Sequence, residues 1–246
     1  MNFTTQYKTE QRELSEYQNW REKCRSRGYF WEVERIDIIN HLINKFNYVN
    51  YLEIGVNDGS CFKKIKAKYK NGVDPGIELF STTTPGLKKY RPVFEVDYPI
   101  TSNKFFELIS SSNIKYDIIF IDGLHHDYQV YEDIKNAFNH ITENGTIVCH
   151  DMNPQWEICQ RKAPLENVGS WNGNCWRAWI KLRSELKNYK MEVVDTDHGV
   201  GIIQKGKQEC LKLSDDAFNL EFWYLSKNRK SLLNLITIEE FYKKYD

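Results

Sequence analysis

The feature that most constrains the fold is an apolar strand that runs into a glycine turn, within Tyr51–Ser60. Glycine without a Cβ lets the backbone approach a ligand closely, and free N–H groups after the turn favour polar or anionic groups. The sequence therefore predicts a nucleotide-type pocket at this strand end. The candidate contacts are Glu53 inside the strand, followed by Gly55, Val56, Asn57, Gly59 and Ser60 in the turn.

The spacing of the turn bears on the kind of ligand. It reads Glu-x-Gly-x-x-x-Gly, whereas a dinucleotide-binding turn reads Gly-x-Gly-x-x-Gly after its strand. This difference counts against an NAD-dependent oxidoreductase.

Composition narrows the class of protein further. Thirty-four basic residues balance thirty-four acidic ones over 246 residues, so no net field favours nucleic acid or an acidic membrane. The length suits one α/β domain with additions. Six cysteines without a C-x-x-C pair argue against a disulfide framework or zinc knuckle. Because no signal core or membrane-spanning run is present, we expect a cytoplasmic protein without membrane or nucleic-acid partners.

The order of predicted elements gives the architecture. Helices are expected within 7–47, 60–70, 102–111, 128–140, 175–186 and 237–245, and strands within 48–56, 72–74, 92–96, 116–121, 145–151, 189–195 and 200–204. Alternating strands and helices predict an α/β, doubly wound, mostly parallel Rossmann-like sheet. The last two strands, joined by a tight polar turn, predict an antiparallel hairpin that closes the sheet.

This order also predicts a division of the chain. Residues 1–47 would be an N-terminal helical extension, 48–206 the main domain and 207–246 a C-terminal extension packed on it. Within the main domain, the irregular stretch 152–175 is a candidate substrate lid.

Four acidic residues follow predicted strands, namely Asp74, Asp97, Asp122 and Asp151. In an open parallel sheet, ligands bind beyond the carboxyl ends of the strands. We therefore expect these carboxylates at the ligand-binding edge.

The motifs resemble a known family. Glu53–Ser60, Val73-Asp74-Pro75, Tyr116–Asp122 and Thr146–Asp151 look like the successive motifs of class I S-adenosylmethionine-dependent methyltransferases. The likeness covers roughly residues 48–204. It is closest to the methyltransferase-24 branch, which includes bacterial sugar and macrolide-sugar O-methyltransferases.

The resemblance implies roles for the cofactor-binding residues. Glu53 would contact the methionine moiety of S-adenosylmethionine, Asp74 beside Pro75 the ribose hydroxyls, and Asp97 the adenine, with Asp122 also in this set. Asp74 has an alternative role, because an Asp before Pro commonly forms a turn.

A second group, Asp122-x-x-His125 with His150-Asp151, predicts the chemistry. Two carboxylates at neighbouring strand ends can share a divalent ion such as Mg²⁺, which lowers the pKa of a sugar hydroxyl while an imidazole takes its proton. By resemblance, Asp122 and Asp151 bind the metal and His125 is the base. His126 is the second candidate for the base. The relatives carry an acidic pair where this chain has His150-Asp151, which is a departure from their pattern.

Aromatic and amide side chains between 154 and 179 suggest where a sugar or glycoside would bind. Trp156 and Trp171 lie in the irregular stretch with Asn172-Gly173-Asn174, and His150 is a further candidate substrate contact. Trp176 and Trp179 have helical spacing and are expected in the core. The basic run 227–230 is interpreted as a solvated surface, with a sugar phosphate as the alternative ligand.

Several alternatives remain at this point. The third metal ligand would be Glu78 or water, and a zinc site built from His125, His126 and His150 is another arrangement. The activity could also be metal-independent N- or carboxyl-methylation, or the chain could be a non-catalytic S-adenosylmethionine-binding subunit. A homo-oligomer is compatible with the sequence.

Overall fold

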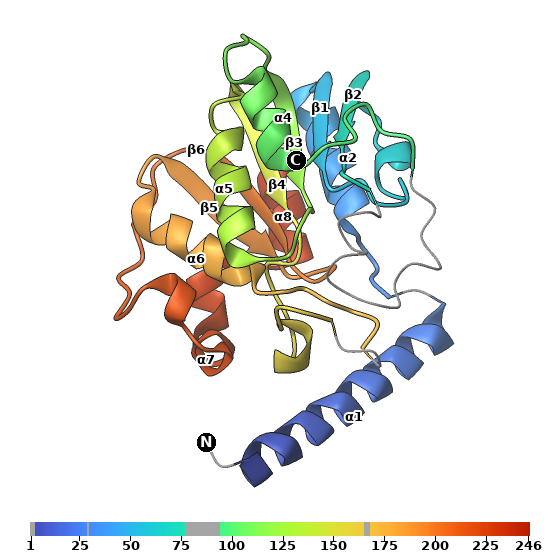
Figure 1. The fold of residues 1–246 in the computed structure, drawn as a ribbon, viewed down its shortest axis with the longest axis vertical. Coiled ribbons are helices and arrows are strands. Elements are labelled where there is room, and N and C mark those ends of the chain that lie inside the picture. The colour runs from blue at the N-terminus through green and yellow to red at the C-terminus, as the bar shows by residue number, and fades with distance from the viewer. Residues whose placement is uncertain (1–2, 29, 77–93, 165–167) are drawn as a thin grey trace.

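The computed structural model describes residues 3–28, 30–76, 94–164 and 168–246. Its core is one seven-stranded sheet with the order β2-β1-β3-β4-β6-β5-β7 (Figure 1). The strands are β1 (Asn50–Ile54), β2 (Tyr69–Val73), β3 (Tyr116–Ile121), β4 (Ile141–Cys149), β5 (Tyr189–Val194), β6 (Val200–Lys205) and β7 (Leu235–Ile236). β6 runs antiparallel to both β4 and β5, and the other neighbouring strands are parallel. The predicted Rossmann-like sheet with a closing antiparallel hairpin is confirmed.

Helices cover both faces of the sheet. The helices of the described residues are α1 (Phe3–Arg27), α2 (Arg35–Phe46), α4 (Ser102–Ile109), α5 (Asp127–Ala137), α6 (Cys175–Glu185), α7 (Phe222–Leu233) and α8 (Ile238–Tyr245), and all but α1 pack on the sheet. Ile119 and Ile121 of β3 belong to the core shared with α4–α7, whereas Ile118 and Phe120 belong to the core shared with α2 and α8. The continuous apolar run of β3 is therefore buried on both faces, as a central parallel strand requires.

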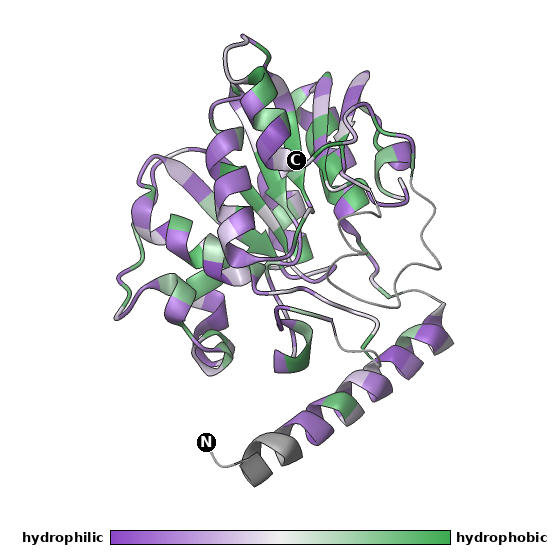
Figure 2. Ribbon diagram, viewed as in Figure 1, coloured by the Kyte–Doolittle hydropathy of each residue, from purple (hydrophilic) through white to green (hydrophobic). Residues whose placement is uncertain are grey.

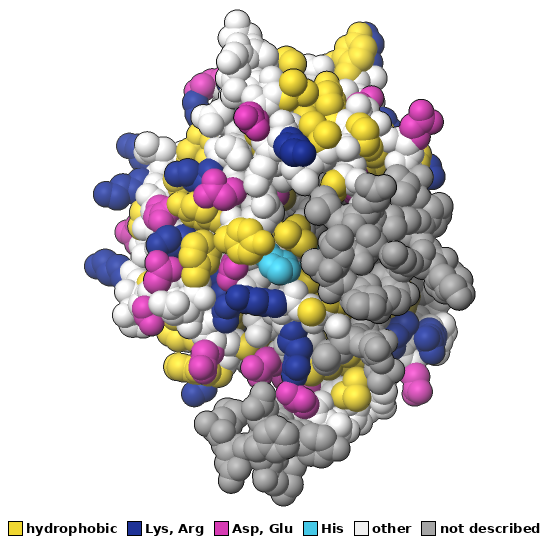
Figure 3. Space-filling view, in the orientation of Figure 1, with side chains coloured by type: hydrophobic (Ala, Val, Ile, Leu, Met, Phe, Trp, Pro, Cys, Tyr) yellow, Lys and Arg dark blue, Asp and Glu magenta, His cyan; other side chains and the backbone are white. Residues whose placement is uncertain are grey.

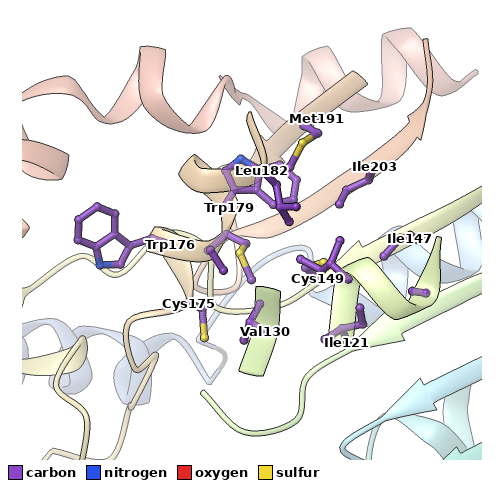
Figure 4. Packing of buried hydrophobic residues seen from close by; sticks show 14 of the residues in the cluster. Ile121, Val130, Ile147, Cys149, Cys175, Trp176, Trp179, Leu182, Met191 and Ile203 are labelled. Carbon is purple, nitrogen blue, oxygen red and sulfur yellow. The ribbon is translucent and has the colours of Figure 1, made fainter. Parts of the chain in front are cut away.

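Hydrophobic residues of the strands and helices point into the two cores. In Figure 2 the strands are largely hydrophobic and the outward sides of the helices hydrophilic. Figure 4 shows Trp179 of α6 beside Leu182, in the core that also contains Cys149 and Ile203. Trp176 and Trp179 are fully buried, as their helical spacing predicted.

Helix α1 lies at the margin of the molecule (Figure 1). Its Tyr17 and Trp20 contact Trp156, with ring centroids 5.6 and 5.5 Å apart. Its Glu13 accepts hydrogen bonds from the backbone of Glu157 and Ile158. The extension thus packs against the segment that was the lid candidate.

One predicted helix is wrong. The segment 60–70 contains only the short 3₁₀ turn η1 (Phe62–Lys64) before β2 begins. Asn40 of α2 accepts a hydrogen bond from Lys66 N and donates one to Lys64 O, and Lys70 Nζ donates to Phe62 O at 2.7 Å. These side chains satisfy backbone groups that a helix would have paired, so tertiary contacts replace the helix that the lysines favour.

Two further differences concern the strand at 92–96 and the C-terminal tail. Residues 92 and 93 lie outside the described part, and 94–96 form no strand. The position is marked by a single parallel bridge between Val73 and Tyr98. The sequence also missed α7 and β7, although α8 is where a helix was expected.

The surface agrees with the absence of net charge. In Figure 3 basic and acidic side chains are interspersed over the visible face rather than gathered in a patch of one sign. Among the residues that the structure describes, no helix is both long and apolar enough to cross a membrane.

Candidate active site

The glycine turn is fixed against the end of β3. Gly55 has φ +89°, and a Cβ built there would lie 2.2 Å from the carbonyl oxygen of Asp122. The Asp122 amide donates to Ile54 O at 2.8 Å. Only glycine meets both requirements, a left-handed φ and this close approach. The turn and Asp122 are therefore adjacent, as the order of the strands predicted.

The other predicted cofactor contacts surround the same turn. Asp74 accepts hydrogen bonds from the amides of Asn57 and Gly76, both at 2.8 Å, and Asp97 accepts one from Gly72 at 2.8 Å. The turn-forming alternative for Asp74 is thus present in the structure. A carboxylate oxygen that accepts one hydrogen bond can accept another, so these backbone bonds do not prevent Asp74 and Asp97 from also binding a ligand. Their contacts to ribose and adenine stay predictions.

The remaining turn residues have different surroundings. Val56 is buried, and the Ser60 amide donates to Asp58 Oδ1 at 2.9 Å. Gly59 has φ +74°, and its Cβ position would fall 2.6 Å from the ring of Phe94. Pro75 lies near the edge of the described residues, followed by Gly76 and then by the undescribed segment 77–93. Glu78, a candidate third metal ligand, falls in that segment.

Glu53 is 1% exposed on β1 and accepts a hydrogen bond from the Tyr51 hydroxyl. Burial raises the pKa of Glu53 to about 8, with a further rise from Asp122, while Tyr51 and Arg35 act in the opposite direction. This carboxyl is a buried group next to the site and not a solvent-facing strand end.

Three predicted residues converge beyond β3 and β4. His125 Nε2 lies 3.3 Å from Asp122 Oδ1, and His125 Nδ1 lies 3.2 Å from Asp151 Oδ2. One ligand atom from each of Asp122, His125 and Asp151 can be chosen so that all three lie within 4.8 Å of one another. The sequence thus correctly predicted that these three side chains meet.

His150 lies on the other side of the same carboxylates. Its Nδ1 is 3.3 Å from Asp122 Oδ1 and 3.3 Å from Asp151 Oδ2. Its Nε2 faces Asp197 Oδ1 at 3.4 Å, in the turn between β5 and β6. His150 therefore bridges three carboxylates.

Arg35 completes this ion network from the N-terminal extension. It is the first residue of α2; its Nη1 is 2.9 Å from Asp197 Oδ2 and its Nε is 3.7 Å from Asp122 Oδ2. Asp122, His150, Asp197 and Arg35 thus form a closed ring of alternating acidic and basic side chains.

The neighbouring carboxylates raise the pKa of both histidines. Burial favours neutral His125, but Asp151 and Asp122 outweigh it and raise its pKa to about 9. Burial likewise opposes the charge of His150, and the neighbouring Asp151 and Asp122 raise its pKa well above the usual value. Despite burial, the positive charges of His150, His125 and Arg35 lower the pKa of Asp122. These pKa shifts favour ionised carboxylates and protonated histidines when no other cation is present.

The remaining candidates for substrate binding and for the base lie in different places. Trp171 stacks on His125, with centroids 5.0 Å apart and an interplanar angle of 28°. Trp156 instead packs on Tyr17 and Trp20 of α1. His126 is the N-cap residue of α5, with ring contacts to Tyr128 and Trp171. Burial lowers the pKa of His126.

Sequence reasoning missed two members of the site. Arg35 looked like one polar residue of an amphipathic helix, and no local signal connects it with Asp122. Asp197 begins the polar sequence Asp197-His198-Gly199 between the last two predicted strands, which indicated only a turn. The structure confirms the turn, with a φ of +41° at Asp197.

The interpretation of the basic run 227–230 as a solvated surface was wrong in part. Arg229 donates hydrogen bonds to Pro154 O at 2.8 Å and to the Asn153 side chain.

The sequence of this region has a family match. Residues 52–152 match the methyltransferase-24 family, described as a methyltransferase domain. Over these residues the chain is similar to that methyltransferase domain. Its matched part begins in β1 and ends directly after Asp151, so it includes the glycine turn, Asp122 and His125. The predicted class, an S-adenosylmethionine-dependent methyltransferase, is confirmed. No curated protein matches the sequence.

Solved structures show a weak likeness to this methyltransferase. An O-methyltransferase from Bacillus cereus in complex with SAH has 13% identity and a TM-score of 0.48, over 78% of this chain and 90% of that one. The SAH-bound methyltransferase PaMTH1 from Podospora anserina has 17% identity and a TM-score of 0.47, over 84% and 97%. The O-methyltransferase TomG from Streptomyces achromogenes, in complex with SAM, has 10% identity and a TM-score of 0.46, over 78% and 89%.

Proposed function

We propose that this methyltransferase transfers a methyl group from S-adenosylmethionine to a hydroxyl of a sugar or glycosylated small molecule. The observation that carries the proposal is the meeting of Asp122, His125 and Asp151 directly beside the glycine turn. A methyl acceptor at this point would lie next to the proposed cofactor site, and alignment of the two reactants supplies much of the acceleration in such reactions.

The donor set fits a small divalent cation such as Mg²⁺. His125 Nδ1 lies 2.8 Å from the carbonyl oxygen of Trp171, and only a protonated nitrogen bonds to that oxygen. In neutral His125 the lone pair of Nε2 would then face Asp122 Oδ1 at 3.3 Å. Two acceptors this close repel each other unless one of them is protonated or positive charge is bound nearby. In the proposal, Asp122 and Asp151 hold the ion, which supplies Lewis acidity that makes a hydroxyl more acidic.

His125 is the proposed base. Trp171 fixes its Nδ1 as the protonated nitrogen, so Nε2 is the atom available to accept a proton from the substrate. Its raised pKa means that it must first lose its own proton, and a cation held by the carboxylates would favour that loss. His126 is less suited to this role because its ring packs on Tyr128 and Trp171.

One observation supports a second candidate, a metal-independent methyltransferase. Arg35, His125 and His150 already place three basic side chains around Asp122, Asp151 and Asp197. A site neutralised in this way could position a more acidic acceptor, such as a carboxyl group, without an ion.

Transfer of a labelled methyl group from S-adenosylmethionine to a panel of glycosides tests the proposal. We expect transfer to a hydroxyl, loss of activity after treatment with EDTA and recovery with added Mg²⁺. Activity that survives EDTA would favour the metal-independent candidate. Methylation only of amines or carboxylic acids would contradict the proposed acceptor.

A further inference from the structure

Four consecutive residues after the undescribed segment 165–167, Trp171–Asn174, hold the proposed catalytic residues in place. The carbonyl of Trp171 lies 2.8 Å from His125 Nδ1, and the Asn174 amide donates to the His125 carbonyl at 3.2 Å. Gly173 has φ +57°, and a Cβ there would lie 1.8 Å from that same carbonyl oxygen. The backbone of this segment therefore runs directly against the loop that carries His125.

Asn172 contacts the other side of the site. Its Nδ2 donates to Asp151 Oδ1 at 2.7 Å, and its amide N–H donates to Cys159 O at 2.8 Å. The side chain is fully buried, and its Oδ1 has no hydrogen-bond partner among the described residues. A buried amide with one unpaired oxygen is costly, so its position needs a compensating role.

The bond from Asn172 determines which oxygen of Asp151 faces the site. Oδ1 is engaged by Asn172, which leaves Oδ2 directed at His125 and His150, 3.2 and 3.3 Å away. Asp151 itself has φ +64°, a conformation that its backbone adopts only under constraint from its surroundings. A donor on Oδ1 thus fixes the rotation of a carboxylate on a strained residue.

We propose that Asn172 is a positioning residue that orients Asp151 for cation binding. This inference rests on the proposed function, because it assumes that Asp151 holds the ion. Partners that hydrogen-bond to metal-ligating carboxylates orient them, and their removal typically lowers metal affinity about 10- to 100-fold. The amides of Asn172 and Asn174 therefore serve the protein's own carboxylates, Asp151 and Asp127, and not the carbohydrate contact that the sequence suggested.

The chain offers a matched control for this role. Asn153 is also a buried asparagine, and its Nδ2 donates to Asp195 Oδ1 at 2.8 Å. The pair Asn153–Asp195 thus repeats the chemistry of Asn172–Asp151, but Asp195 is not one of the three clustered ligands. Loss of the Asn153 amide removes this hydrogen bond and also the acceptor of a bond from Arg229, so the control variant loses at least as many hydrogen bonds as the Asn172 variant. Only loss of the Asn172 amide should change cation binding.

The test is a titration of the full-length protein with Mn²⁺, followed by electron paramagnetic resonance, for wild type, Asn172→Leu and Asn153→Leu. We expect the Mn²⁺ dissociation constant to rise about 10- to 100-fold in Asn172→Leu and to stay near wild type in Asn153→Leu. The affinity for S-adenosylhomocysteine should be unchanged in both. If Asn172→Leu does not fold, Asn172→Ser, which keeps a hydroxyl donor on a shorter side chain, should show a smaller rise.

Three outcomes would overturn the inference. Equal Mn²⁺ affinity in wild type and the Asn172 variants would show that Asp151 needs no positioning by the amide. An equal loss in Asn153→Leu would show a general effect of destabilisation. A wild-type protein that binds S-adenosylhomocysteine but not Mn²⁺ would contradict the metal in the proposed function, and with it this inference.

Discussion

Arg35 and Asp122 form an ion pair between the N-terminal extension and the centre of the sheet. Arg35 Nε lies 3.7 Å from Asp122 Oδ2, and the same guanidinium binds Asp197 in the closing hairpin. One side chain from outside the matched region 52–152 thus joins the end of β3 to the turn between β5 and β6. The extension is part of the site and not only an addition to the domain.

The first prediction concerns this ion pair. Arg35→Gln leaves Asp122 and Asp197 without their cation, and breaking a largely buried pair typically costs about 3–5 kcal/mol of unfolding free energy. Arg12→Gln is the control, because Arg12 pairs with Glu16 on the exposed side of α1 and should cost less than about 1 kcal/mol. Urea unfolding of both variants measures the difference. Equal stability of the two variants would mean that the Arg35 network contributes nothing.

The second prediction separates the two histidines. His125→Ala removes the proposed base and should lower kcat about 10²- to 10⁴-fold, whereas its affinity for S-adenosylhomocysteine stays near wild type. His126→Ala is the control and should keep kcat within a few fold. Steady-state kinetics with binding measured by calorimetry distinguish the effects. A large loss in His126→Ala with a small one in His125→Ala would reverse the assignment.

The third prediction uses the buried carboxyl of Glu53. Its pKa rises from 4.5 to about 8 on folding, chiefly through burial, so the folded state holds the proton more strongly than the unfolded state. The stability that protonated Glu53 contributes is complete below pH 4.5 and is lost as the pH rises to 8. A glutamine at position 53 does not ionise, so Glu53→Gln should not lose this stability as the pH rises.

We therefore expect Glu53→Gln to gain stability relative to wild type as the pH rises through that window, by at most about 1.4 kcal/mol per pH unit. Urea unfolding of both proteins at several pH values measures the difference. A difference in unfolding free energy that does not change with pH would contradict the raised pKa of Glu53.

The fourth prediction tests the glycine turn. Gly55→Ala and Gly28→Ala both place alanine at a left-handed φ, which costs about 1–2 kcal/mol. A Cβ at Gly55 also meets the carbonyl of Asp122, whereas one at Gly28 has no atom within 4 Å. Gly55→Ala should therefore be clearly less stable than Gly28→Ala and should bind S-adenosylmethionine more weakly. Equal stability of the two variants would show that the turn can move away from Asp122.

The sequence correctly predicted the elements whose structure follows from their own hydrophobic pattern. Ile118–Ile121 is a continuous apolar run, and the predicted strand 116–121 is a strand with those bounds. The helix prediction for 60–70 was wrong because Asn40 of α2 and the Lys70 side chain at the end of the segment bind its backbone groups. Such contacts leave no periodic signal in the sequence.

Only part of the candidate site could likewise be predicted from the sequence. Strand ends placed Asp122, His125 and Asp151 together, because the carboxyl ends of neighbouring parallel strands share one edge. Arg35, Asp197 and the contact of Asn172 with Asp151 depend on how an extension, a hairpin turn and a loop pack over that edge. The spacing of residues in the chain does not record that packing.

The most direct test of the central claim is a calorimetric titration of the protein with S-adenosylmethionine, with and without Mg²⁺. We expect saturable binding at one site, lost or strongly weakened in Gly55→Ala and retained in His126→Ala. Absence of binding in both conditions would contradict the assignment of this strand end as the cofactor site.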